Sequence, residues 1–169
     1  MATEHVVGAH LLETLIAELG KMKARADKAM GQLTADQQFH ATLDPDSNSV
    51  AIIVRHLAGN MRSRWTDFLT TDGEKPSRNR DGEFEPTALT RAALLQEWEA
   101  GWSCLFAALQ SLPPAALTQK VRIAGKEMTA LEAIVRAFEH YAGHVGQVVL
   151  LAKHLAGPHW QTLSVPKKR

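Results

Sequence analysis

Two histidines, His140 and His144, lie four residues apart in a segment, residues 133–147, whose pattern is helical. An α-helix turns by about 100° per residue, so the two imidazoles project from one face, one turn apart. Two imidazoles placed in this way can bind one metal ion, and neutral imidazole suits zinc, nickel, copper or iron. The spacing alone is a weak indication, because eight histidines in 169 residues give about 0.4 such pairs by chance.

His56 is the residue that best completes a three-ligand site. It lies in the middle of a predicted helix over residues 50–69, beside the apolar stripe, and Asn60 follows it by one turn. A catalytic metal site typically uses three protein ligands and keeps one position for water or substrate. The pattern is equally typical of a histidine that is hydrogen-bonded at a helix interface, so the residues alone leave both interpretations open.

Several other kinds of site are disfavoured. Glu139 precedes His140 but projects about 100° away from it, so the metalloprotease arrangement of two histidines and a glutamate is missing. The sequence has no glycine-rich phosphate loop and no serine-hydrolase nucleophile motif. Cys104 is the only cysteine, so the chain makes no internal disulfide, and it stands outside any ligand spacing.

Length and composition predict one domain, residues 1–169, that folds without a stapling metal. Nineteen basic and eighteen acidic residues leave a formal charge of +1, so we expect no nucleic-acid partner and no binding to an anionic membrane. No apolar run approaches the ~20 residues that span a bilayer, and the first residues lack the pattern of a secretory signal. We therefore expect a cytoplasmic protein.

Four amphipathic helices must position the histidines. Apolar residues recur at three- and four-residue steps through four segments. These segments are residues 4–30, 50–69, 87–111 and 129–155. Ser47 or Ser49 can cap the second helix, Thr87 or Thr90 the third, and Thr129 with Glu132 forms a capping box for the fourth.

These elements predict an all-α fold, a four-helix bundle, with almost no strand signal. Residues 120–128 alternate polar and apolar side chains around Gly125, which indicates a short hairpin. The polar segment 70–86 is longer than a connection between neighbouring helices needs, so it can cross the bundle and leave helices two and three parallel. A flexible polar insertion is the other interpretation of that segment.

Several blocks in order resemble an uncharacterised branch of the DinB-like (DinB/YfiT) superfamily of metalloenzymes, and the likeness covers nearly the whole chain. The blocks are His56–Met61, Ser63–Leu69, Asp72–Pro76, Arg78–Asp81, His140–Gln147 and Trp160–Pro166. The resemblance implies a four-helix bundle of up-down-down-up topology, often a homodimer. It further implies a divalent metal, zinc or nickel, held by one histidine from helix two and two from helix four. Those positions are His56, His140 and His144 here.

Characterised relatives in that superfamily include transferases and isomerases that use low-molecular-weight thiols such as bacillithiol, mycothiol or glutathione. The resemblance therefore implies a metal-dependent, thiol S-transferase-like enzyme with a small-molecule substrate. Asn60 can orient a ligand, and Arg64 and Arg136 can meet an anionic group, although each also fits a surface role. Two alternatives stay open: a non-enzymatic stress-related or sensing module, and metal-assisted hydrolysis, for which the sequence offers no obvious general base.

Overall fold

The computed structural model describes residues 2–165, and of residues 2–5 only the backbone. The fold is mostly helical, with five α-helices, three short 3₁₀ helices and one two-stranded sheet among the described residues. The elements in chain order are α1 (Ala2–Met30), α2 (Asp36–His40), α3 (Val50–Trp65), η1 (Asp81–Phe84), α4 (Arg91–Gln110), η2 (Pro114–Thr118), β1 (Lys120–Ile123), β2 (Lys126–Thr129), α5 (Ala130–Ala156) and η3 (Gly157–His159). Within these residues, no helix combines the length and the hydrophobicity that crossing a membrane requires.

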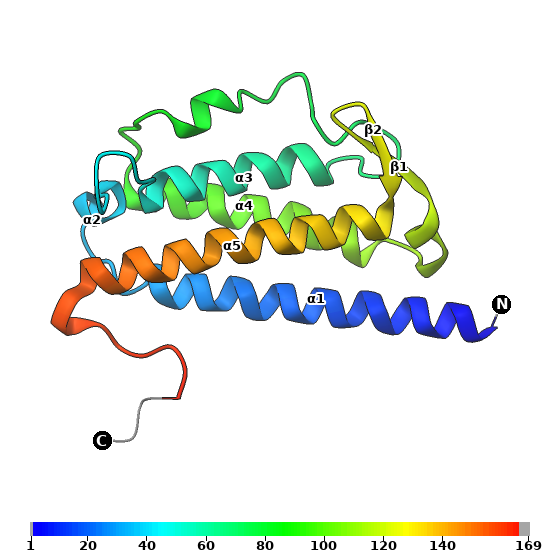
Figure 1. Ribbon diagram of the computed structural model, residues 1–169, viewed down its shortest axis with the longest axis horizontal. Helices are drawn as coiled ribbons and strands as arrows, with labels where there is room; N and C mark the ends of the chain where they lie inside the picture. Colours follow the sequence, from blue (N-terminus) through cyan, green and yellow to red (C-terminus); the bar gives the residue numbers. More distant parts are fainter. Residues whose placement is uncertain (1, 166–169) are drawn as a thin grey trace.

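The four long helices lie side by side, with α3 packed mainly on α4 and α1 on α5 (Figure 1). The colours of Figure 1 show α3 and α4 running in one direction and α1 and α5 in the other. Residues at the ends of α3 and α4, Trp65 and Ala108 among them, line one hollow. The segment after α3 must therefore return along the whole molecule before α4 begins.

Most helix boundaries follow the predicted signals. The hydroxyl groups of Ser49, Thr90 and Thr129 accept backbone N–H bonds at the starts of α3, α4 and α5. The capping box between Thr129 and Glu132 is also present, as predicted. The short helix α2 lies inside a stretch for which the sequence predicted no regular structure.

The predicted end of the second helix at residue 69 was wrong by four residues, because α3 stops at Trp65. Asp67 has a φ of 50°, a left-handed conformation that a helix cannot continue through. Its carbonyl oxygen instead accepts hydrogen bonds from the backbone N–H groups of Thr70 and Thr71, both at 3.0 Å. The chain turns there and leaves the helix axis.

The predicted hairpin is confirmed as the antiparallel pair β1 and β2. Its two loop residues, Ala124 and Gly125, have φ values of 51° and 74°, as a tight two-residue turn with the twist of the strands requires. The carboxylate of Asp72 accepts the backbone N–H groups of both loop residues at 2.8 Å. This anchor fixes the hairpin against the segment that follows α3.

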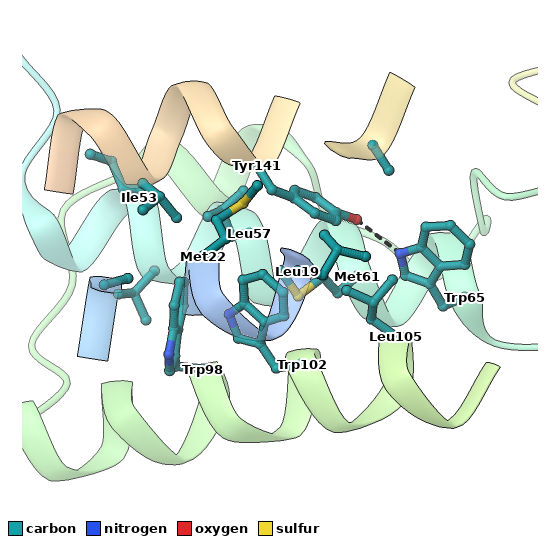
Figure 2. Close-up of a cluster of buried hydrophobic side chains, with 14 of the residues drawn as sticks. Leu19, Met22, Ile53, Leu57, Met61, Trp65, Trp98, Trp102, Leu105 and Tyr141 are labelled. Atoms are coloured by element: carbon teal, nitrogen blue, oxygen red, sulfur yellow. Dashed lines mark hydrogen bonds between the residues drawn. The ribbon is translucent and has the colours of Figure 1, made fainter. Parts of the chain in front are cut away.

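The core lies between the four long helices, and Figure 2 shows the large side chains that fill it. Trp98 and Trp102 of α4 pack edge to face, with ring centroids 5.5 Å apart, and Tyr141 of α5 lies 5.9 Å from Trp102. A Cβ atom on Gly101 would stand only 2.8 Å from the Cα of Ala58. The absence of a side chain on Gly101 therefore permits the close approach of α4 to α3.

The segment between α3 and α4 is tied to α3 along its length. The guanidinium of Arg55 donates hydrogen bonds to the carbonyl oxygens of Glu85 at 2.7 Å and Gly82 at 2.8 Å. These bonds hold η1 against the side of α3, where Glu83 and Phe84 reach His56. The segment is therefore a packed part of the structure that borders the histidines.

Candidate metal centre

The three predicted ligands, His56, His140 and His144, come together in the structure. Each offers one ring nitrogen, and these nitrogens all lie within 4.8 Å of one another. The Nε2 atoms of His56 and His140 are 3.1 Å apart. His56 is buried in α3, whereas His140 and His144 on α5 are half-buried, at the border between core and solvent.

A buried carboxylate fixes the orientation of His56. Glu83 Oε2 lies 3.0 Å from His56 Nδ1, so the imidazole donates its Nδ1–H to the carboxylate. With that proton engaged, a neutral His56 presents the lone pair of Nε2 to the other two histidines. A carboxylate behind a histidine in this way is the usual support of a metal ligand, because it fixes the tautomer and the ring plane.

Glu83 is held as an anion by Arg78. The Nε and Nη2 groups of Arg78 donate to the two carboxylate oxygens at 2.8 and 2.7 Å, a bidentate pair. Burial opposes the charge and by itself raises the pKa of Glu83, but the hydrogen bonds from Arg78 and His56 outweigh it and lower the pKa. Glu83 is therefore ionised near neutral pH and accepts a hydrogen bond from the Nδ1–H group of His56.

Room for Glu83 comes from a glycine in α3. A Cβ atom on Gly59 would overlap the carboxylate group of Glu83, with the carboxylate carbon only 2.8 Å away. No other residue at this position leaves that space without moving the carboxylate. His56 and Gly59 thus lie one turn apart on α3. One is the candidate ligand, and the other leaves space for the carboxylate that binds it.

Burial favours the neutral form of the other two histidines, His140 and His144. Burial, with smaller effects from the neighbouring histidines, lowers the pKa of His140 to about 4. Burial also lowers the pKa of His144, against the opposing effect of a 2.9 Å hydrogen bond between His144 Nδ1 and Gln147 Oε1. Since the Gln147 oxygen can only accept, His144 donates from Nδ1 and keeps Nε2 as its free lone pair.

Asn60 is buried beside the histidines and belongs to a chain of hydrogen bonds that starts in the core. Trp65 Nε1 donates to the hydroxyl of Tyr141 at 2.9 Å, the dashed line in Figure 2. The tyrosine proton then points to Asn60 Oδ1 at 3.0 Å. Because the carbonyl of Asn60 faces Tyr141, its NH₂ group is the side that can meet a ligand.

The histidines open into a cleft of about 590 Å³ between α3, α5, the hairpin and the segment after α3. Asn60, Arg64 and Arg136, the three other residues singled out from the sequence, all line this cleft. The side chain of Arg64 is only 12% exposed, whereas Arg136 is exposed. The structure thus brings every predicted site residue to one hollow.

Glu83 and Arg78 were missed by the sequence analysis. Both lie in the polar segment between α3 and α4, where no periodic pattern marks a side chain as buried. Their burial depends on how that segment returns along α3, which the sequence alone does not specify. The one available signal was Gly59, a glycine inside a helix three residues after a candidate ligand.

The spacing of one ligand pair, His56 and His140, fits a divalent transition metal. Two nitrogens bound to zinc at ~2.0–2.1 Å in a tetrahedral arrangement lie about 3.3 Å apart, close to the 3.1 Å between the Nε2 atoms of His56 and His140. The ligand set is three imidazoles, which suits zinc, nickel, copper or iron better than magnesium or calcium. A cleft on the open side leaves access for a further ligand.

Fold and site together define a mostly helical protein with a cluster of three histidines at the rim of its core. The chain belongs to a family described as proteins of unknown function, DUF1572, whose family model matches residues 6–169. Comparison with curated proteins gives no match, and comparison with solved structures gives none either. The function is therefore argued from the site.

Proposed function

We propose that this protein is a divalent-metal-dependent enzyme with a thiol S-transferase-like activity on a small molecule. The observation that carries the proposal is the cluster of His56, His140 and His144, whose ligand atoms lie within 4.8 Å of one another. The hydrogen bond from His56 to Glu83 adds the outer support that metal sites use. When bound, zinc or nickel would lower the pKa of a coordinating thiol and so supply thiolate near neutral pH.

The chain's own residues have three tasks in this proposal. Glu83 accepts a hydrogen bond from the Nδ1–H group of His56, and Gln147 accepts one from the Nδ1–H group of His144. Both rings therefore keep their orientation. The half-buried position of His140 and His144 leaves one side of the cluster open to the cleft. A low-molecular-weight thiol and its electrophilic partner would meet in that cleft, with the NH₂ group of Asn60 as a donor.

The proposal includes a DinB-like four-helix bundle of up-down-down-up topology. The shared direction of α3 and α4, and the long return segment between them, support that topology (Figure 1). It also includes a homodimer, which the exposed apolar side chains Val135 and Leu150 on the outside of α5 favour. Sedimentation velocity of the full chain tests the dimer.

Metal-assisted hydrolysis is a second candidate, favoured by one specific observation. Glu74 and Glu139 line the same cleft as the histidines, so carboxylates that could act as a general base are present after all. The sequence alone did not show that these two glutamates lie beside the histidines. Hydrolysis of activated esters by the metal-loaded protein distinguishes this candidate from thiol transfer.

The first test is metal content of the untagged full chain after supplementation with zinc or nickel. We expect one ion per chain in the native protein and loss of that ion in His144→Ala. His154→Ala is the matched control, because His154 is an exposed histidine on the same helix and should leave metal content unchanged. Failure of the native chain to bind either metal would overturn the proposal.

The second test is thiol consumption by the metal-loaded protein with glutathione, mycothiol or bacillithiol and a small electrophile such as 1-chloro-2,4-dinitrobenzene. We expect turnover that disappears in His144→Ala and persists in His154→Ala. Metal binding without turnover of any thiol or ester would instead indicate the non-enzymatic sensing module.

A further inference from the structure

The cleft beside the histidines carries an excess of positive charge. Four arginines line it, against two glutamates. The arginines are Arg64, Arg78, Arg80 and Arg136, and the glutamates are Glu74 and Glu139. Neutral imidazoles contribute no negative charge to balance these cations, and a divalent metal would add to them. The hollow is therefore suited to a ligand that carries negative charge.

Arg78 does not supply this binding capacity, because its charge is already matched. It pairs with Glu83 through two short hydrogen bonds and approaches Glu74 at 3.3 Å. With a side chain only 5% exposed, it serves to hold Glu83 in place. Arg80 also has an acidic neighbour, since its guanidinium lies 3.7 Å from the carboxylate of Asp81. The free cationic character of the cleft must therefore come from Arg64 and Arg136.

Arg64 differs from Arg78 in its partners. Its nearest carboxylate oxygen, on Glu74, is 3.9 Å from Nη2, beyond hydrogen-bond distance. Its Nε is buried and has no hydrogen-bond partner among the described residues 2–165. Burial is the main cause that lowers the pKa of Arg64. A charged guanidinium that is 12% exposed and has no hydrogen-bonded carboxylate is costly unless a ligand pairs with it.

The position of Arg64 is built into the fold. A Cβ atom on Gly73 would stand 2.9 Å from Arg64 Cδ, so the bare backbone of Gly73 makes the space in which the arginine lies. Gly73 is itself fixed, because its N–H donates to the carbonyl oxygen of Arg122 in β1 at 2.8 Å. The hairpin and the segment after α3 thus hold the guanidinium against the wall of the cleft.

The distance from the histidines defines the kind of ligand. Arg64 follows His56 by eight residues of α3, about 12 Å along the helix axis, and Asn60 lies halfway between them. Asn60, Arg64 and His56 all line the same cleft, so a ligand of this length can contact all three. Arg136, one turn before His140 on α5, lines the cleft near Arg64, and its charge acts on the pKa of Arg64.

We infer that Arg64, with Arg136 and the NH₂ group of Asn60, forms a subsite for a carboxylate on an extended small molecule whose other end reaches the three histidines. The inference rests on the proposed function, because a metal at the histidines anchors that other end. A carboxylate fits better than a phosphate dianion, since one buried guanidinium neutralises one charge and Arg136 is exposed.

The test uses two matched probes that bind metals without any thiol chemistry. One is octanedioic acid monohydroxamate, which has a free carboxylate, and the other is the same hydroxamate with a terminal primary amide. Titration calorimetry on the zinc-loaded full chain should show the carboxylate probe binding ~10-fold more tightly or better, as expected for a charge-assisted hydrogen bond in a partly buried site.

Arg64→Gln should reduce this preference to less than twofold while metal content stays unchanged. Arg64→Lys, which retains the charge without the planar fork, should keep part of it. Arg62→Gln is the control, because Arg62 is a 47% exposed arginine on the same helix and does not line this cleft. An undiminished preference in Arg64→Gln, or equal binding of both probes to the native chain, overturns the inference.

A metal-free arm separates this inference from the proposed function. If the native chain binds no metal, the proposed function fails, and the subsite is judged by NMR titration of the metal-free chain with glutarate. Glutarate shifts that are lost in Arg64→Gln support the subsite, and no shift in the native chain overturns it. Tighter binding of inorganic phosphate than of glutarate, lost in the same variant, overturns the assignment to a carboxylate.

Discussion

Glu83 reaches His56 over the bare backbone of Gly59, so a side chain on residue 59 and the carboxylate of Glu83 would occupy the same space. The relationship joins a helix residue to one that is 24 positions later in the chain. It explains why a glycine, which costs helix stability, lies inside α3 one turn from a candidate ligand.

Gly59→Ala should displace Glu83 and weaken metal binding roughly 10- to 100-fold, the usual effect of losing the support behind a metal-ligating histidine. The three ligands themselves remain. Competition with a chromophoric chelator for zinc measures the affinity. Gly146→Ala is the matched control, because a Cβ atom at that helical glycine meets nothing within 4 Å.

Glu83→Gln provides an independent measurement in case Gly59→Ala folds poorly. It keeps the shape of the side chain and removes the negative charge of the group that accepts the hydrogen bond from His56. Equal zinc affinity in the native protein and in both variants would show that Glu83 gives His56 no support.

Tyr141→Phe should destabilise the fold by about 1–3 kcal/mol, because it leaves the buried N–H of Trp65 and the buried carbonyl of Asn60 without partners. Urea unfolding measures the free energy of unfolding. Combining Tyr141→Phe with Trp65→Phe should destabilise the fold by less than the sum of the two single substitutions. Strict additivity would mean that the hydrogen bond between Trp65 and Tyr141 contributes nothing to stability.

Asp72→Asn should loosen the hairpin, since the carboxylate accepts the N–H groups of Glu74, Ala124 and Gly125. These backbone bonds lower the pKa of Asp72. The stabilisation is therefore complete above the ordinary aspartate pKa of about 3.9 and is lost as the pH falls through the lower pKa of the folded state.

Amide hydrogen exchange at Ala124 and Gly125 provides the measurement for Asp72→Asn. Near neutral pH the variant should exchange faster than the native chain at these two amides. Asp81→Asn, at a side chain that is 97% exposed, is the control and should leave exchange there unchanged. Unaltered protection in Asp72→Asn would show that turn geometry alone holds the hairpin.

Gly101→Ala should lower stability by about 1–3 kcal/mol through overpacking, although alanine is the better helix former. The new methyl group would lie 2.8 Å from the Cα of Ala58 and push α3 away from α4. Gly20→Ala in α1, where a Cβ meets nothing within 4 Å, should instead be neutral or stabilising. A native urea midpoint in Gly101→Ala would contradict the close contact of α3 and α4.

The sequence predicted the long helices, their caps and the hairpin well, because those features depend on local residue patterns. It also identified His56, His140 and His144, whose positions on amphipathic helices follow from helical periodicity. The early end of α3 was missed because it depends on the left-handed conformation of Asp67, which residues other than glycine adopt only occasionally and which no sequence pattern marks here.

The residues behind the histidines could not be predicted for a different reason. Glu83 and Arg78 bind each other and His56 only because a long polar segment follows one particular path over α3. No pattern of alternating or periodic apolar residues specifies such a path. The lack of hydrogen-bond partners at Arg64 is likewise a property of the packed structure. In the sequence, nothing distinguishes Arg64 from the other arginines.

The hydrogen bond from Trp65 to Tyr141 also gives the protein a built-in optical signal. Tyr141 is the only tyrosine in the chain, and it lies against two indoles while donating a hydrogen bond to Asn60 at the wall of the cleft. Excitation energy absorbed by this one phenol passes efficiently to tryptophan at such short range. A ligand that disturbs the hydrogen bonds at Asn60 should therefore change the fluorescence of the native, unlabelled chain, so that occupancy can be followed without attaching a dye.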